Sequence, residues 1–172
     1  LNENDEAKLD EMLDDASSDR LTGIVYWITL IYGAFGILVA MNQAFSWDPM
    51  GFVLVDNSFY YLLIAIFLPI SFLVFPARKA DQFKVPFYDW ILFAVTLVSA
   101  MYMAYHGIDM VEQGWDLVAP DEPTLVAAII CFLSLEAVRR AGGFALFVIV
   151  AMFFLFPLWT ESAPGFLWGV PK

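Results

Sequence analysis

The sequence predicts an all-α integral membrane protein with four core transmembrane helices, a fifth linking span and a short acidic amphipathic helix at the N-terminus. Hydrophobic residues make up 61% of the 172 residues, against about 45–50% in soluble domains, and charged residues make up 16%, against about 25%. The formal net charge is nevertheless −11, because the charged residues are separated from long apolar runs. Seventeen phenylalanines and six tryptophans are more than a core of this size buries. This combination excludes an ordinary soluble enzyme.

The first predicted unit is the acidic head, residues 1–20, which carries eight acidic and two basic residues. Its apolar residues follow the i, i+3, i+4, i+7 spacing of one helix face, and they are Leu9, Met12, Leu13 and Ala16. The head is either a solvated tail or a helix docked on a partner or along the membrane edge. Its acidity disfavours binding to anionic lipid. It also lacks the positive n-region of a signal peptide, and the first residue, Leu1, is not expected to be the native start.

The first predicted span covers residues 21–45, which contain no charged residue. At about 1.5 Å per residue this stretch exceeds a bilayer core of about 30 Å. Tyr26 and Trp27 lie near one end, as expected of an aromatic belt. Gly33 and Gly36 predict a flat strip where another helix approaches closely.

Four further apolar runs follow. They are residues 59–76, interrupted by Pro69 as an expected kink, 86–106, 123–138 and 144–159. We expect five crossings rather than one broken helix over the last two runs, because a broken helix would bury Arg139 and Arg140 in the membrane.

The basic residues predict the orientation. Seven of the eight fall on one predicted side: Lys8, Arg20, Arg78, Lys79, Lys84, Arg139 and Arg140. Only Lys172 falls on the other, so the N-terminus is predicted to be cytoplasmic. The expected organisation is a head at 1–20, a four-span domain at 21–140, and a fifth span with an outward tail at 141–172.

Several site chemistries are not supported. The acidic balance argues against nucleic acid as a partner. The single cysteine, Cys131, offers no cysteine-based metal site, and the Gly142-Gly143 pair is too short for a phosphate loop. The acidic loop at 107–123 lacks the spacing of a calcium loop. We therefore expect no cofactor, no bound metal and no catalytic residue.

Two local clusters remain as candidates. Glu136 lies three and four residues before Arg139 and Arg140, which places an acid–base pair on one helix face at the cytoplasmic edge. This cluster is interpreted as a topological anchor, an interface or a lipid-headgroup site. His106, the only histidine, lies three residues before Asp109, and the pair is either a proton relay or a polar tip in the headgroup layer.

The segment LEAVRRAGG at 135–143, the triplet Tyr88-Asp89-Trp90, the Phe75-Pro76 pair and the Pro164-Gly165 pair together resemble the small membrane subunit of TRAP transporters. The TAXI-type branch, in which this region is commonly fused to the large one, is the most similar. The resemblance covers about residues 20–170. Two departures are the segment 56–59, where a His-Leu pair is expected, and Trp168-Gly169 in place of a basic turn.

The resemblance implies a scaffold subunit or domain of a secondary transporter in a bacterial or archaeal inner membrane. Such systems import organic anions with an ion gradient and a periplasmic TAXI-type substrate-binding protein, and a large permease subunit carries the substrate site. The nearly charge-free middle of each span independently favours a supporting role. Membrane lipid is a further expected partner. The alternatives are a small membrane-embedded enzyme using His106 and Asp109, and an accessory assembly subunit of another membrane complex.

Overall fold

The computed structural model describes residues 21, 23–45, 54–78, 81, 84–115 and 117–156. Within these ranges the chain is helical and contains no strand. Its elements are α2 (Ile24–Phe45), α3 (Asp56–Val74), α4 (Phe87–Tyr105), α5 (Gly107–Glu112) and α6 (Asp121–Leu155). The acidic head at 1–20 and the tail after residue 156 lie outside the described residues.

The predicted fold class is confirmed. Four of the helices, α2, α3, α4 and α6, are long and apolar enough to cross a membrane, which makes this a multi-pass membrane protein. At about 1.5 Å per residue, the 22 residues of α2 and the 19 residues of α3 and of α4 each match the thickness of a bilayer core. Helix α3 continues through Pro69, so the expected kink does not divide it.

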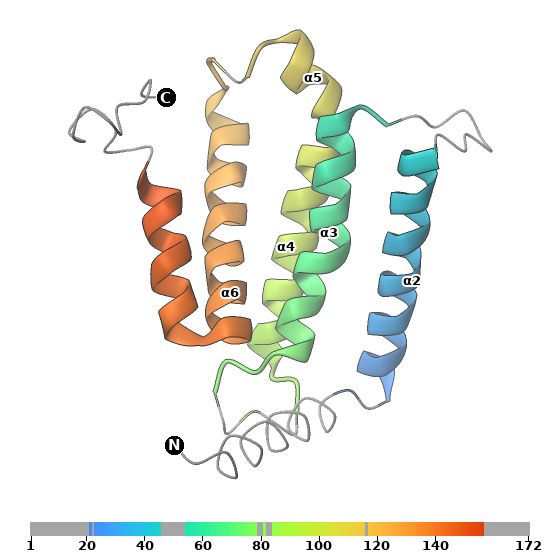
Figure 1. Ribbon diagram of the computed structural model, residues 1–172, viewed down its shortest axis with the longest axis vertical. Helices are drawn as coiled ribbons and strands as arrows, with labels where there is room; N and C mark the ends of the chain where they lie inside the picture. Colours follow the sequence, from blue (N-terminus) through green and yellow to red (C-terminus); the bar gives the residue numbers. More distant parts are fainter. Residues whose placement is uncertain are drawn as a thin grey trace.

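The core of the bundle lies where α3 and α4 pack side by side (Figure 1). Helix α2 packs on α3 from one side, and α6 packs on α4 and α3 from the other. Buried apolar residues from α3, α4, α5 and α6 form one cluster: Ala65, Ala100, Met103, Met110 and Ile130. A second cluster, Phe72, Leu133 and Ala137, joins α3 to α6 nearer the opposite end.

Helix α6 consists of two arms that meet at Gly143. The backbone of Gly143 has φ 75° and ψ −177°, which is not helical and which residues with a Cβ essentially never adopt. In Figure 1 the second arm, in orange-red, turns back beside the first. The bend directly follows Arg139 and Arg140, in agreement with a break between the two predicted runs. The described part of the second arm, residues 144–155, is about 18 Å long at 1.5 Å per residue, and the rest of the predicted fifth span lies outside the described residues.

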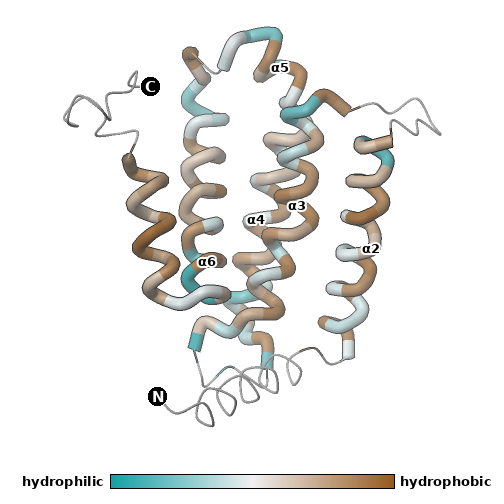
Figure 2. The backbone as a smooth tube through the Cα atoms, viewed as in Figure 1, coloured by the Kyte–Doolittle hydropathy of each residue, from teal (hydrophilic) through white to brown (hydrophobic). Residues whose placement is uncertain are grey.

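Charged residues gather at the two ends of the bundle, as Figure 2 shows for the hydrophilic positions. The described basic residues are all at the end where α3 ends, α4 begins and α6 bends: Arg78, Lys84, Arg139 and Arg140. The opposite end carries acidic residues: Asp56, Asp109, Glu112, Asp121 and Glu122. The predicted orientation rests on basic residues lying at one end of the bundle, and the described ones do. Which end faces the cytoplasm stays a prediction.

Candidate functional site

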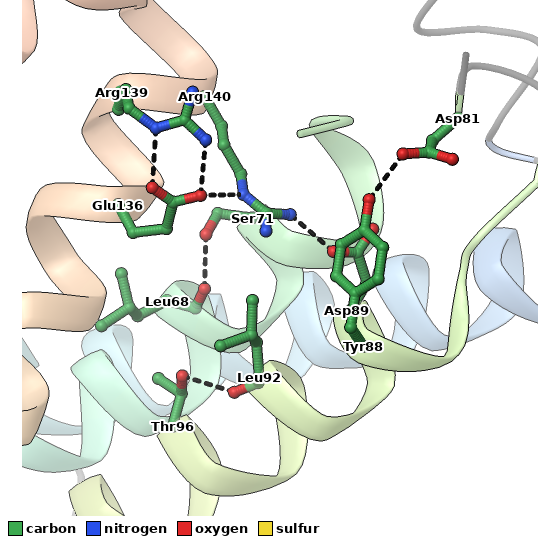
Figure 3. Close-up of polar contacts among 10 residues, drawn as sticks. All are labelled: Leu68, Ser71, Asp81, Tyr88, Asp89, Leu92, Thr96, Glu136, Arg139 and Arg140. Atoms are coloured by element: carbon green, nitrogen blue, oxygen red, sulfur yellow. Dashed lines mark hydrogen bonds and ion pairs between the residues drawn. The ribbon is translucent and has the colours of Figure 1, made fainter. Parts of the chain in front are cut away.

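The predicted acid–base cluster on α6 forms as its spacing indicates. Arg139 donates from Nε to Oε2 of Glu136 and from Nη2 to Oε1, each at 2.7 Å. Arg140 donates from Nε to Oε1 of the same carboxylate at 2.8 Å. One carboxylate thus accepts from two guanidiniums on successive residues, in the bidentate geometry that makes arginine–carboxylate pairs strong. Figure 3 shows the cluster beside the bend of α6.

Arg140 also connects α6 to the start of α4. Its Nη1 atom donates to Oδ1 of Asp89 at 2.7 Å, across 51 residues of sequence (Figure 3). The side chain of Arg140 is 2% exposed and that of Asp89 is 0% exposed. The guanidinium carbon lies 5.1 Å from the centroid of the buried Phe72 ring on α3. Arg140 therefore contacts three helices at one end of the bundle.

The position of Asp89 follows from the local sequence. Pro86 precedes the first turn of α4 with an extended backbone, and its carbonyl accepts from the Asp89 N–H at 3.1 Å. An acidic side chain in the first turn is favoured by the positive end of the helix dipole. The same turn faces α6, so the carboxylate is buried where the Arg140 guanidinium arrives.

The two neighbours of Asp89 have other contacts. The Tyr88 hydroxyl donates to Oδ2 of Asp81 at 2.5 Å, which fastens the connection between α3 and α4 onto α4 (Figure 3). Trp90 is half-buried and its ring lies 6.0 Å from that of Phe93, edge to face. The structure thus brings Asp89 together with Glu136, Arg139 and Arg140, while Tyr88 bonds to Asp81 and Trp90 contacts Phe93.

The two glycines predicted on the first span differ in their surroundings. Gly36 is buried, and a Cβ there would lie 2.9 Å from Cε2 of Phe67 and 3.0 Å from Cγ2 of Ile66 on α3. A Cβ at Gly33 would meet no described atom within 4 Å. Of these two glycines, only Gly36 lies at a close approach between α2 and α3.

At the opposite end of the bundle, the His106–Asp109 pair is formed. Nδ1 of His106 lies 2.6 Å from Oδ2 of Asp109. The imidazole is surrounded by the rings of Tyr102, Tyr105 and Trp115, at centroid distances of 4.6, 5.2 and 6.0 Å. An imidazole held by a carboxylate in this way has the geometry of an oriented general base, and equally that of a fixed polar group in the headgroup layer.

Two hydroxyl side chains on the spans donate to backbone carbonyls of their own helices. The hydroxyl of Ser71 donates to the Leu68 carbonyl at 2.6 Å, and that of Thr96 to the Leu92 carbonyl at 2.7 Å (Figure 3). Cys131 is exposed on α6. Among the described residues, no group of three or more His, Cys, Asp or Glu side chains is placed to hold a metal ion.

Comparison with protein-family models, with curated proteins and with solved structures finds no significant match to this chain. The resemblance to TRAP small subunits therefore stays a prediction from the sequence motifs. Sequence reasoning identified both ends of the Asp89–Arg140 contact but not the contact itself. It missed Phe72 and Asp81, since neither position carries a local sequence signal that sets it apart from other span and loop residues.

Proposed function

We propose that this protein is the small scaffold subunit or domain of a TRAP-type secondary transporter in a bacterial or archaeal inner membrane. In this role it would widen the fixed part of a large permease that imports organic anions. A periplasmic TAXI-type substrate-binding protein would deliver the substrate, and an ion gradient would drive the import. The chain itself would carry no substrate site.

The observation that carries this proposal is the Asp89–Arg140–Glu136–Arg139 network. Its residues lie in two of the four segments on which the resemblance rests, Tyr88-Asp89-Trp90 and LEAVRRAGG, and Arg140 joins α4, α6 and α3. Residues that fix three helices relative to one another suit a rigid scaffold. A protein that moves substrate usually breaks a helix near the membrane midplane instead.

The distribution of ionisable residues also supports a scaffold. On α2, α3 and α4 the only Asp, Glu, Lys or Arg residues are Asp56 and Asp89, both in a first helical turn. Intramembrane charges normally mark ion and proton pathways, so a bundle with charges only near its ends offers little for coupled transport.

The experiment is affinity purification of the tagged chain from its native membrane, combined with uptake of a radiolabelled carboxylate. We expect a larger membrane protein of about a dozen spans to co-purify, and uptake to require both this chain and the binding protein. If the parent reading frame continues past Lys172, the same spans are expected in the fused protein. Purification of the chain without any such partner, with anion uptake unchanged when it is deleted, refutes the proposal.

A variant pair sharpens the test. Arg139→Ala combined with Arg140→Ala should reduce assembly and the maximal uptake rate, and leave the substrate concentration for half-maximal uptake unchanged. Lys84→Ala removes a positive charge at the same end of the bundle and serves as the matched control. A double variant that assembles normally but changes substrate preference contradicts a scaffold role.

A second candidate function, a small membrane enzyme, is favoured by one observation, the 2.6 Å contact between His106 and Asp109. His106→Ala separates the two functions. A scaffold should retain near-normal uptake in this variant, because the imidazole lies at the end of the bundle opposite the arginine network. Loss of function in His106→Ala with normal assembly would favour the enzyme.

A further inference from the structure

The end of the bundle with the α6 bend contains a polar cavity outside the buried network. Its volume is about 670 Å³, and it is lined by Ala77, Arg78, Tyr88, Glu136 and Arg139. These residues come from the connection after α3, the first turn of α4 and the last two turns before the bend of α6. The cavity therefore opens at the depth where helix ends meet the headgroup layer.

The lining is richer in positive than in negative charge. It holds two guanidiniums and one carboxylate, and the Glu136 carboxylate already accepts from both Arg139 and Arg140. Arg140 has a second carboxylate in Asp89. Arg78 is exposed, and its guanidinium makes no ion pair with any residue of the described ranges. The two guanidiniums and one carboxylate of the lining leave one net positive charge among the lining residues. The Asp81 carboxylate is outside the lining and accepts from the Tyr88 hydroxyl.

Two arginines facing one open cavity suit a phosphate group. The planar guanidinium presents paired N–H donors that match the oxygens of a phosphate, and it is less strongly hydrated than a lysine ammonium. Basic pockets between transmembrane helices on the cytoplasmic side are a known way of binding anionic lipid headgroups.

A second feature distinguishes a lipid from a free anion. Four residues with the i, i+3, i+7, i+10 spacing of one helix face run along α4 from the cavity toward the middle of the span. They are Tyr88, Ile91, Val95 and Val98, which are 40%, 47%, 39% and 67% exposed. An acyl chain attached to a headgroup in the cavity would lie along this stripe.

We propose that this cavity binds the phosphate of an anionic phospholipid, with Arg78 and Arg139 holding the headgroup and the exposed α4 stripe contacting an acyl chain. The site uses no residue of the His106–Asp109 pair and does not depend on the proposed transporter role. The bound lipid would lie beside the Asp89–Arg140 contact and shield it from water.

The test is native mass spectrometry of the full chain in an uncharged detergent, titrated with phosphatidylglycerol or with phosphatidylcholine of the same acyl chains. We expect phosphatidylglycerol to bind about tenfold more tightly, a difference of about 1.4 kcal/mol. Arg78→Gln and Arg139→Gln should each weaken phosphatidylglycerol binding by about tenfold. Lys84→Gln, which removes a positive charge at the same end but outside the cavity, should change it by less than about twofold.

Three results would overturn the proposal. The first is equal binding of the two lipids. The second is unchanged phosphatidylglycerol binding in Arg78→Gln. This variant is expected to fold normally because Arg78 is exposed and outside the buried network, and far-ultraviolet circular dichroism checks its helix content. The third is binding of inorganic phosphate or glycerol 3-phosphate as tightly as the lipid, which would assign the cavity to a soluble anion and remove the role of the α4 stripe.

Discussion

Replacing Arg140 by methionine removes the residue that joins three helices and leaves an unbranched apolar side chain without the terminal guanidinium nitrogens. The variant loses the hydrogen bond to Asp89 at 2.7 Å, the one to Glu136 at 2.8 Å and the contact with the Phe72 ring. Glu136 keeps both of its bonds to Arg139. Asp89, with a side chain that is 0% exposed, loses its guanidinium.

The expected loss of unfolding free energy is about 3–5 kcal/mol, the range for removing one partner of a buried ion pair. Most of that loss comes from the buried Asp89 carboxylate rather than from the bonds themselves. A double variant, Asp89→Leu with Arg140→Met, removes both charges and should therefore recover much of the stability. Replacing a complete buried pair by apolar residues is often neutral or stabilising.

The assay is reversible unfolding in mixed micelles, with helix content followed as the fraction of sodium dodecyl sulfate is raised. Arg78→Met is the matched control, since it makes the same substitution at an exposed arginine at the same end, and it should change stability by less than about 0.5 kcal/mol. If Arg140→Met were as stable as Arg78→Met, the contact with Asp89 would carry no stability. If the double variant were less stable than Arg140→Met, the cost would not come from the buried charge.

Four glycine substitutions test the helix contacts and the bend of α6 in the same assay. Gly36→Leu should destabilise the protein by about 1–3 kcal/mol because its side chain meets α3, whereas Gly33→Leu should leave the stability nearly unchanged. If Gly33→Leu alone lost co-purification of a partner, a subunit contact would be located at Gly33. Gly107→Ala places a Cβ 2.6 Å from the backbone N of Ser58 and 2.8 Å from its Cα, so it should destabilise the protein. Adding Ser58→Gly should not restore the stability, because the clash is with the Ser58 backbone. Restored stability would mean that only the Ser58 side chain is in the way. Gly143→Ala should cost about 1–3 kcal/mol through backbone strain alone, and an unchanged stability would contradict the bent form of α6.

The parts of the fold that the sequence predicts are those set by local chemistry. Long apolar runs locate the four membrane helices, because the length and composition of a span are determined by the bilayer. The i, i+3 and i, i+4 spacing predicts the pairs of Glu136 with Arg139 and Arg140, and the three-residue spacing predicts the contact of His106 with Asp109, since one helical turn brings such residues together. Each of these contacts depends on one segment alone.

Contacts between segments are not predicted. Asp89 reads as an acid near the membrane interface and Arg140 as a topological anchor, and 51 residues separate them. Nothing in either segment specifies which helix packs on which, because that depends on how the side chains of all the helices fit together. The same reason explains why Gly36 and Gly33 are equivalent in sequence and different in the structure. Only Gly36 lies where α2 meets α3.

The ends and the sides of this bundle differ in what they offer a partner. Along the sides, large apolar residues remain exposed, among them Phe35 and Leu38 on α2 and Phe153 on the second arm of α6. Inside a membrane such residues gain little by leaving lipid for a protein surface, so a partner helix must be held there by close packing. Charge recognition is confined to the two ends, where the carboxylates and the arginines lie. We therefore expect substitutions along the sides to weaken any partner uniformly, and substitutions of exposed end residues such as Arg78 to change which partner or lipid is bound.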